Sequence, residues 1–600
     1  MAVPAWVARV PPVAAVAVAL IALQLVVRAV LAFGGYFYWD DLILVGRAGT
    51  QGLLSPSSLF DDHDGHVMPA AFLVAGVITR LAPLVWTWPA VSLVILQLLV
   101  SLSLLRALYV ILGWRPVLLI PLTFALFTPL GVPGFAWWAA ALNSLPMLAA
   151  MAWVCADAIL LLRTGNRRYA VTGVLVYFGG LLFFEKAAVI PFVAFTVTAL
   201  LWHVRGEQVR TVWRAGVHLW VPMTALTAAW VAVYLVVVDQ QRWSSDLAMT
   251  WDLLRRSFTH GIVPGLAGGP WEWQRWAPAS PWGVPPLSVM VLGWLVLAAV
   301  VAVSLARKQR IGPVWLAALG YAVACQIPIY LMRSSKFTAL ELAQTLRYLP
   351  DLVVVLALLA AVGFCAPNRA RSGRLDASRT RTAVTLAAAV AFLASSLYST
   401  STFLISWQDN PAQPYLQNAV RGLGQARAAS SAPLLDQEVD PLVLQRVAYP
   451  ENLASHMFAL IRDRPEFARY TTQLRMLDST GRLVDANVTW VRTIVVGPKP
   501  GCGYFVQSDG QPDTPVRMPL DGPMLPAEWT AEINYLANSD GSMLMSLTEG
   551  PETKVAVHPG LNRVFVRLSG AGDAITVRSG TTALSLCLAS GPVGYLAPRH

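Results

Sequence analysis

The first carboxylates in the sequence are the adjacent Asp40 and Asp41, which follow an apolar run over 10–33 and four consecutive aromatic residues at 36–39. Ionisable side chains at the edge of a hydrocarbon layer are costly to keep there, so this pair is a candidate for function. The alternative is an aromatic belt at a membrane surface followed by a hydrated acidic turn.

The polar loop that follows carries the densest group of acidic and histidine residues in the chain. Its members are Asp61, Asp62, His63, Asp64 and His66. Carboxylate oxygens suit Mg²⁺, Mn²⁺ or Ca²⁺, and the same groups can hydrogen-bond sugar hydroxyls. The spacing is not that of a calcium loop. The group could bind a divalent cation, but its pattern does not require any cofactor. The alternative is a solvated loop that caps the next helix.

Two adjacent opposite charges, Glu185 and Lys186, lie between two short apolar runs. We expect Lys186 to bind an anionic group near the membrane surface, with Glu185 orienting it. The alternative is that the two charges neutralise each other at the interface.

A third charged group contains Arg333, Lys336 and Glu341, with Arg347 just beyond it. A lipid phosphate is its natural partner, because arginine recognises phosphate through two parallel hydrogen bonds and lysine adds a point charge. The alternative is that these side chains extend to ordinary lipid headgroups.

The composition of the chain indicates the element type that must position these residues. Its 600 residues are 56% hydrophobic and only 13% charged, with a mean hydropathy of +0.56. Soluble chains carry about 25% charged residues, so a soluble enzyme, a disordered protein and an ordinary nucleic-acid binder are excluded. The composition predicts a polytopic α-helical membrane protein.

A spanning helix needs about 20 mostly apolar residues, and we predict eleven spans. They lie near 10–33, 90–112, 116–131, 141–163, 169–184, 187–203, 214–238, 287–306, 313–332, 345–366 and 383–404. The apolar segment 68–86 is interrupted by Arg80 and Pro83, and we expect it to form short helices in the outer leaflet without crossing. The first run exceeds the length of a signal-peptide core and reads as an uncleaved anchor.

Basic turns set the orientation, because lysine and arginine are enriched on the cytoplasmic side. These turns lie at 163–168, 205–214, 307–310 and 369–381. Placing them in the cytoplasm puts the three charged groups and the tail on the extracytoplasmic side of the cytoplasmic (inner) membrane. The net charge of +11 therefore reflects topology and does not indicate a nucleic-acid partner.

The composition changes from Ile405 onward. We expect a transmembrane domain over 1–404, an extracytoplasmic mixed α/β connecting region over 405–487, and an extracytoplasmic β-sandwich over 488–600, where short strands alternate with turns. The tail holds two of the chain's five cysteines, Cys502 and Cys587. Disulfides persist outside the cell, so we expect these two to be bonded, the alternative being two free buried thiols.

An outer acidic pair after the first span, an outer-leaflet helical hairpin and an outer tail domain together resemble the GT-C superfamily of membrane glycosyltransferases. The resemblance covers about residues 1–404 in layout, and in sequence it is specific mainly at Trp39, Asp40 and Asp41. The tail is similar to the carbohydrate-binding modules of actinobacterial arabinosyltransferases. The richness in alanine, valine and arginine also suits an actinobacterium.

The resemblance implies roles for the charged residues. Asp40 or Asp41 would be the general base, with a small preference for Asp41. Lys186, Arg333, Lys336 and Arg347 would bind the donor phosphate. Glu185 and the group Asp61, Asp62, His63, Asp64 and His66 would complete the acceptor and sugar site. Whether a metal takes part is left open.

The function implied is the inverting transfer of arabinofuranose or mannose from a polyprenyl-phosphate donor to a cell-envelope glycan or glycolipid. The expected partners are that donor, that acceptor and membrane lipids. One alternative is a non-enzymatic transporter of polyprenyl lipids or glycolipids, or a glycan-binding envelope protein, on the same scaffold. A phosphoethanolamine-type transferase ranks last, because the tail shows no zinc set with a nucleophilic Ser or Thr.

Overall fold

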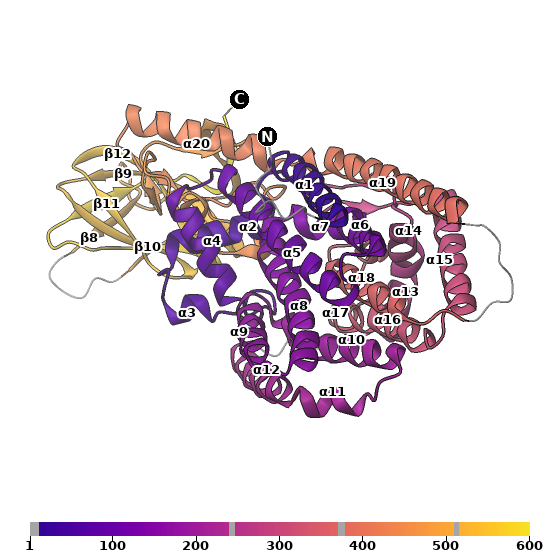
Figure 1. The fold of residues 1–600 in the computed structure, drawn as a ribbon. Helices are drawn as coiled ribbons and strands as arrows, with labels where there is room; N and C mark the ends of the chain where they lie inside the picture. The colour runs from indigo at the N-terminus through magenta and orange to yellow at the C-terminus, as the bar shows by residue number, and fades with distance from the viewer. Residues whose placement is uncertain (1–10, 239–245, 370–377, 509–514, 600) are drawn as a thin grey trace, which may run out of the picture. The chain divides into compact units, whose positions relative to one another are not determined.

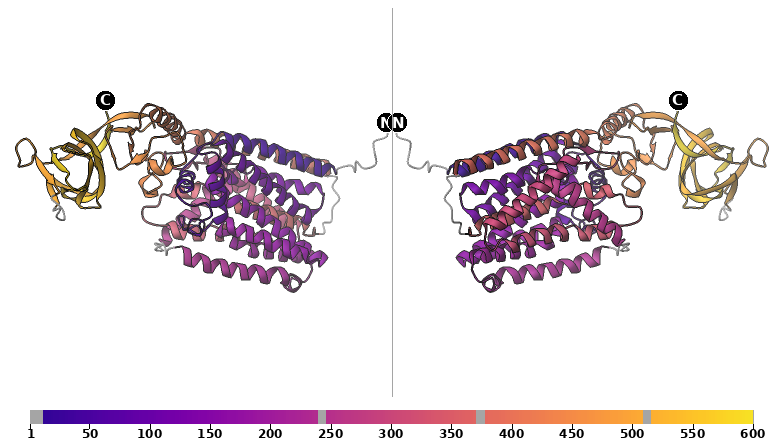
Figure 2. Two further views of the ribbon diagram at one scale, coloured as in Figure 1. Left: turned by 90° about the vertical axis from the view of Figure 1, so that its left-hand side faces the viewer. Right: turned by 90° about the vertical axis from the view of Figure 1, so that its right-hand side faces the viewer.

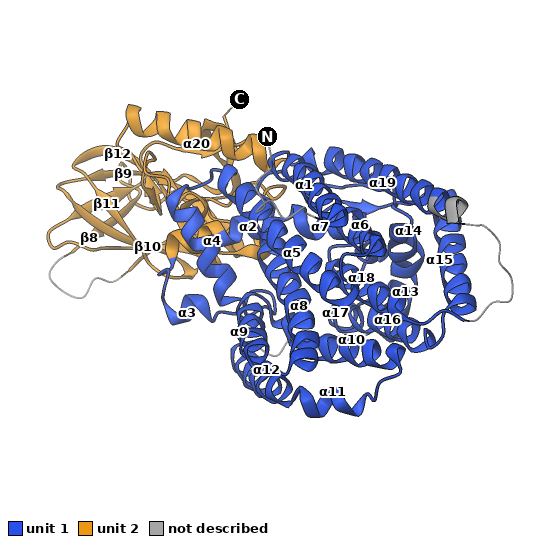
Figure 3. Cartoon of the chain, viewed as in Figure 1, with its two compact units in different colours: residues 1–44, 51–410 blue, residues 45–50, 411–600 orange. Residues whose placement is uncertain are grey.

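The computed structural model describes residues 11–238, 246–369, 378–508 and 515–599. The chain forms two compact units, coloured separately in Figure 3. The first comprises residues 1–44 and 51–410 and is helical, and the second comprises residues 45–50 and 411–600 and is rich in strands. The change of unit follows Asn410, beyond the predicted boundary at 404, because helix α19 (Ser378–Gln408) continues without a break to Gln408.

Eight helical segments in the described residues are long and apolar enough to cross a membrane. They are Pro12–Phe33 (α1), Thr87–Leu112 (α5), Trp138–Thr164 (α8), Glu185–Arg205 (η3 and α10), Val217–Val237 (α12), Leu287–Arg307 (α15), Gly312–Arg333 (α16 and α17) and Ala383–Ala429 (α19 and α20). A helix satisfies its own backbone hydrogen bonds, as a segment in lipid must. The predicted class, a multi-pass helical membrane protein with a strand-rich C-terminal domain, is confirmed.

The remaining predicted spans correspond to shorter or bent helices. The run 116–131 falls on a pair, Pro116–Phe127 and Pro129–Ala136, bent by 44°. The runs 169–184 and 345–366 fall on α9 (Arg168–Phe183) and α18 (Pro350–Cys365), each of 16 residues. Each of the eleven predicted runs therefore contains a helix, and the number that crosses the membrane stays a prediction.

The helices of the first unit differ in burial according to their neighbours. Helix α8 packs against α5, α9, α10 and α18, and 72% of its most apolar window is buried. In α15 only 11% of the corresponding window is buried. Leu292, Trp294 and Leu295 are exposed there, as suits contact with lipid. The long helices of this unit run roughly parallel in Figure 2.

The segment between α1 and α5 contains only short helices: α2 (Asp40–Thr50), α3 (Pro56–Leu59) and α4 (Pro69–Leu81). Helix α4 has 13 residues. At a rise of about 1.5 Å per residue it is about 20 Å long, against a hydrocarbon core of about 30 Å. The expectation that 68–86 does not cross stays a prediction, since α9 and α18, with 16 residues each, are also shorter than this core.

The first unit is completed by short elements between the long helices. These are η1 (Pro116–Leu118), α6 (Leu119–Phe127), η2 (Pro129–Gly131), α7 (Val132–Ala136), α11 (Arg210–Ala215), α13 (Leu247–Arg256), η4 (Ser257–Ile262), α14 (Val263–Leu266), β1 (Trp273–Gln274), β2 (Trp282–Gly283) and η5 (Leu340–Gln344).

The second unit begins with helix α20 (Ala412–Ala429), whose buried residues Tyr415, Leu416, Ala419 and Leu423 recur at intervals of three and four, as one packed helix face requires. The unit also contains η6 (Arg446–Ala448), α21 (Ala454–Met457) and twelve strands. The strands are β3 (Leu434–Leu435), β4 (Phe467–Ala468), β5 (Tyr470–Thr471), β6 (Arg475–Leu477), β7 (Leu483–Thr493), β8 (Tyr504–Gln507), β9 (Val516–Ala537), β10 (Gly541–Glu549), β11 (Thr553–Val557), β12 (Gly560–Ser579), β13 (Ser585–Leu588) and β14 (Pro592–Pro598).

Ten of these strands form one continuous sheet, in the region for which the sequence predicted a β-sandwich. Its main path is β11-β10-β12-β9-β14-β7-β6, and β13, β8 and β5 pair alongside it. The 22-residue β9 and the 20-residue β12 are antiparallel along most of their length, with register shifts at Gly570 and Gly572. The sheet's main hydrophobic core includes Trp529, Tyr535 and Leu568, and a smaller cluster around Val488 and Phe565 lies beside strands β7 and β12. Cys502 and Cys587 are joined by a disulfide.

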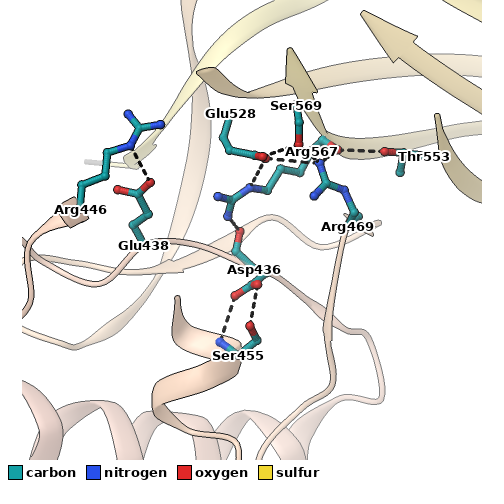
Figure 4. A network of polar contacts seen from close by, with 9 residues as sticks. All are labelled: Asp436, Glu438, Arg446, Ser455, Arg469, Glu528, Thr553, Arg567 and Ser569. Carbon is teal, nitrogen blue, oxygen red and sulfur yellow. Dashed lines mark hydrogen bonds and ion pairs between the residues drawn. The ribbon is translucent and has the colours of Figure 1, made fainter. Parts of the chain in front are cut away.

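A buried polar network joins the segment around Asp436 to strands β9 and β12 (Figure 4). Arg567 donates to the backbone oxygen of Asp436 and, at 2.8 Å, to the carboxylate of Glu528, which also accepts a hydrogen bond from Ser569. The carboxylate of Asp436 in turn accepts from the backbone and hydroxyl of Ser455. Because each drawn group has a partner, the network is structural in character.

Candidate active site

The two adjacent carboxylates at the start of α2 occupy different environments. The Asp41 side chain is fully buried, and both its oxygens accept backbone hydrogen bonds, from Tyr38 at 2.9 Å and from Ala139 at 2.7 Å. Ala139 is in the first turn of α8, so Asp41 fastens the aromatic segment to the N-terminus of that helix. With both oxygens engaged, Asp41 is poorly placed to accept a proton from a substrate. The preference for Asp41 as the base is therefore not supported by its contacts.

Asp40 has the opposite character. In the part of the chain that the structure describes, no hydrogen bond or ion pair reaches its carboxylate. Burial raises the pKa of Asp40 to about 6, and the nearby arginine charges oppose this shift. A carboxyl group with a pKa near neutrality and no fixed partner has the properties of a general base.

The charges that act on Asp40 come from three distant parts of the sequence. Arg347, Arg333 and His66 lower the pKa of Asp40, whereas Asp64 raises it. Sequence reasoning placed these residues in three separate groups. The fold gathers the five into one cluster, which we call the outer cluster: Asp40, Asp64, His66, Arg333 and Arg347.

A tight turn presents the acidic and histidine side chains of the cluster. His63 and His66 exchange both backbone hydrogen bonds, and the two residues between them, Asp64 and Gly65, have φ of +52° and +84°. This is the pattern of a type I′ turn, for which Asp-Gly is a favoured sequence. Asp62 accepts a hydrogen bond from the backbone of Gly65 at 2.7 Å and so shapes the turn.

Glu185 forms an ion pair with a residue of this turn and not with Lys186, its neighbour in the sequence. Its carboxylate lies 2.8 Å from the Nδ1 atom of His66. Burial lowers the pKa of the His66 ring, but the Glu185 carboxylate outweighs that effect, so the net shift in the pKa of His66 is upward. Histidine in this pair holds a proton to higher pH than a free imidazole.

Lys186 is engaged elsewhere. Its ammonium nitrogen lies 2.9 Å from the carboxylate of Asp351, a buried residue at the start of α18, which also accepts a hydrogen bond from Tyr321. Glu185 and Lys186 therefore each form an ion pair with a residue distant in sequence, and the orienting role of Glu185 stays a prediction. A lysine held by a buried carboxylate is less available to a donor phosphate than the arginines are.

The two arginines of the cluster keep the capacity to bind an anion. The guanidinium of Arg347 lies over the rings of Trp137 and Tyr348, at 4.8 and 4.9 Å from their centroids, and no carboxylate in the described residues is within ion-pair distance of it. Arg333 lies 3.1 Å from Asp64, which is 71% exposed. An exposed pair of this kind is weak and easily exchanged for a ligand.

Backbone strain coincides with the outer cluster. Trp39 and Leu346, which immediately precede Asp40 and Arg347, have φ of +44° and +56°, and Asp64 belongs to the same class. Side chains other than glycine rarely adopt positive φ, and such strain concentrates at functional sites. No pattern in the sequence signals Trp39 or Leu346 as strained.

The remaining predicted site residues lie outside this arrangement. Asp61 is half-buried and precedes the turn, the His63 ring packs edge-on against Phe72, and Lys336 is exposed above the ring of Phe337. In the residues described, no group of three or more His, Cys, Asp or Glu side chains is arranged to hold a metal ion. The cluster thus combines an unpaired carboxylate with arginine side chains.

Comparison with known proteins gives only distant likenesses. No family model matches the chain, and no curated protein matches it. The crystal structure of ArnT from Cupriavidus metallidurans in the apo state is similar at a TM-score of 0.41 and 14% identity, over 76% of this chain and 86% of that one. Arabinosyltransferase EmbB from Mycobacterium smegmatis is similar at 0.32 and 11%, over 97% of this chain and 64% of that longer one. The second is named for the class that the sequence resembles, but likenesses at these scores carry no argument about this chain.

Proposed function

We propose that the chain is a membrane glycosyltransferase of the GT-C type that takes a sugar from a polyprenyl-phosphate donor. Asp40 is the general base, and Arg347 and Arg333 hold the donor phosphate. The observation that carries the proposal is the environment of Asp40, an unpaired carboxyl group with a pKa near 6 that faces two arginines. The resemblance to the GT-C superfamily, in sequence at Trp39, Asp40 and Asp41 and in layout over about residues 1–404, supports the same interpretation.

The proposed reaction is a single displacement at the anomeric carbon. Asp40 accepts the proton of the acceptor hydroxyl as its oxygen forms a bond to that carbon. The bond from the anomeric carbon to the phosphate oxygen breaks, and polyprenyl phosphate leaves with the bonding electrons. One displacement inverts the configuration of the sugar.

The arginines act on the leaving group. Negative charge grows on the phosphate as its bond to the sugar breaks, and fixed cations there lower the barrier. Arg347 is suited to this role because its guanidinium is already held against Trp137 and Tyr348, so little side-chain freedom is lost on binding.

The His66–Glu185 pair and Asp64 supply hydrogen-bonding groups beside Asp40, and we assign them to sugar or acceptor hydroxyls. The site lies on the extracytoplasmic side in the proposed orientation. The donor sugar is arabinofuranose or mannose and the acceptor is an envelope glycan or glycolipid, with the strand-rich unit as a glycan-binding module.

The direct test uses membranes that contain the full chain, polyprenyl-phospho-arabinofuranose and polyprenyl-phospho-mannose as alternative donors, and an oligosaccharide acceptor. We expect release of polyprenyl phosphate with one donor and a product of inverted anomeric configuration. Asp40→Asn should lower transfer by at least about a hundredfold. Asp252→Asn, at a half-exposed residue of α13 whose ion-pair partner among the described residues is Arg255, is the matched control and should transfer normally.

The alternative of a non-enzymatic lipid transporter or glycan-binding protein makes a different prediction for the same assay. It requires that wild-type membranes release no polyprenyl phosphate with either donor. Full transfer by the Asp40→Asn variant would instead show that the chain is a glycosyltransferase whose general base is not Asp40.

A further inference from the structure

A second cationic group lies within the helical unit, apart from the outer cluster. Arg28 belongs to α1 and is only 4% exposed. Its guanidinium lies 5.0 Å from the centroid of the Phe135 ring, and its Nη1 atom is buried with no hydrogen-bond partner. No carboxylate or carbonyl among the described residues bonds to this guanidinium.

Another arginine of a candidate span shows how this chain treats a buried cation. Arg106 of α5 forms an ion pair with the fully buried carboxylate of Asp157 and donates a hydrogen bond to the carbonyl of Trp153 at 3.1 Å. A charged side chain in a membrane is normally paired in this way, because leaving it unpaired costs several kcal/mol. The missing acceptor at Arg28 therefore points to one supplied from outside the chain.

The surroundings of Arg28 form a pocket. This small pocket, which opens to the outside, is bounded by Arg28, Gln97, Ser101 and Ser144 among apolar side chains of α5, α6, α8 and α18. Gln24, one helical turn from Arg28 on α1, accepts a hydrogen bond from Ser101, while its own amide nitrogen is buried without a partner. Two unpaired donors thus lie a turn apart, and both need acceptors.

The pocket lies beside the outer cluster without being part of it. Gly134 lines the pocket, and a Cβ atom placed on it would lie 3.3 Å from the carbonyl oxygen of Arg347. Phe135, beneath Arg28, is two residues from Trp137, beneath Arg347. Two rings of this short segment therefore each contact an arginine: Phe135 contacts Arg28 of the pocket, and Trp137 contacts Arg347 of the outer cluster.

We propose that the Arg28 pocket binds the phosphate group of a lipid. A phosphate offers several acceptor oxygens to the planar guanidinium of Arg28, while Gln97 and Ser144 add polar groups to the lining, and the apolar remainder of the lining suits the adjoining chain. Arg28 lies five residues before the end of α1 at Phe33, within reach of a headgroup drawn a short way into the membrane. The site needs only a lipid phosphate, so it does not rest on the proposed transfer reaction.

The experiment uses the full chain in a neutral detergent, with farnesyl phosphate as the probe, farnesol as its uncharged analogue, and inorganic phosphate. Binding is measured by native mass spectrometry and by the shift in thermal unfolding. We expect saturable binding of farnesyl phosphate alone. Because the outer cluster is itself proposed to bind a polyprenyl phosphate, the Arg28 variants are compared in the Arg347→Gln background. There Arg28→Gln should weaken the binding more than about tenfold, because one partner of a buried ion pair is lost, and Arg28→Lys should weaken it less.

Control variants separate this site from the outer cluster and from general damage. Arg347→Gln should keep the Arg28-dependent binding, and Arg106→Gln should keep it despite a lower melting temperature. Without ligand, Arg28→Gln should be at least as stable as the wild type, because an unpaired buried charge has been removed.

Undiminished binding when Arg28→Gln is added to Arg347→Gln, or loss of binding in Arg347→Gln alone, would overturn the proposal. Equal Arg28-dependent binding of inorganic phosphate would overturn its lipid part. Absence of sugar transfer in the wild type would count against the proposed function only, since the binding measurement needs no turnover.

Discussion

Asp40 and Asp41 are chemically identical neighbours whose surroundings give them different properties. Asp41 receives two backbone hydrogen bonds and has no exposed surface, whereas Asp40 has no partner among the described residues. A sequence cannot distinguish the two, because their difference arises from Ala139, which is nearly a hundred residues away. The same holds for Lys186, whose partner Asp351 belongs to another helix.

Substitution of the two aspartates should therefore have opposite effects. Asp41→Asn leaves one of the two backbone donors without an acceptor and should lower the free energy of unfolding by about 1–3 kcal/mol. Asp40→Asn should leave the melting temperature near that of the wild type and lower transfer by about 10²–10⁴-fold, the usual contribution of a general base. Thermal unfolding in detergent and initial transfer rates check both. Equal loss of stability in the two variants would contradict the assignment.

The pH dependence of transfer reports on the same carboxyl group. Burial raises the pKa of Asp40 to about 6, and the base must be deprotonated, so kcat/KM should fall as pH decreases through about 6. Arg347 lowers this pKa by stabilising the carboxylate. Arg347→Gln should therefore move the acidic limb to higher pH, and a profile measured over pH 5–8 checks the direction. A merely structural role for Arg347 would lower the rate at every pH and leave the limb in place.

At the scale of elements, the turn over 63–66 positions two residues of the outer cluster. Gly65 has a φ of +84°, where an added Cβ costs about 1–2 kcal/mol, so Gly65→Ala should displace Asp64 and His66. We expect a higher KM for the acceptor and a smaller change in kcat. Gly320→Ala, in α16 (Gly312–Ala324) with open space around a Cβ atom, is the matched control and should leave both unchanged.

Hydropathy predicted the helices well and the site only in part. Each apolar run contains a helix, because a long apolar segment in lipid must satisfy its backbone hydrogen bonds internally, as a helix does. Because hydropathy is averaged over a window of residues, it did not single out Arg28, which is one cation within an otherwise apolar run. The positive φ of Trp39 and of Leu346 was not predictable, because no turn motif in the sequence marks either position. The sheet of the second unit was predicted as strand-rich, but its continuity depends on the long strands β9 and β12.

At the scale of the whole molecule, the chain has two units with separate cores, and only the second contains a disulfide. Cys502 and Cys587 close a loop of 85 residues, for which lost chain entropy in the unfolded state gives about 4–5 kcal/mol of stabilisation. The double variant Cys502→Ser and Cys587→Ser should therefore lower the unfolding temperature of the second unit. The transition of the helical unit should stay where it is, because its three cysteines are not bonded.

Calorimetry of the full chain in detergent, with and without reductant, checks this: reductant should reproduce the effect in the wild type and do nothing further in the double variant. A shift of both transitions together would show that the two units unfold as one, contrary to their separate cores.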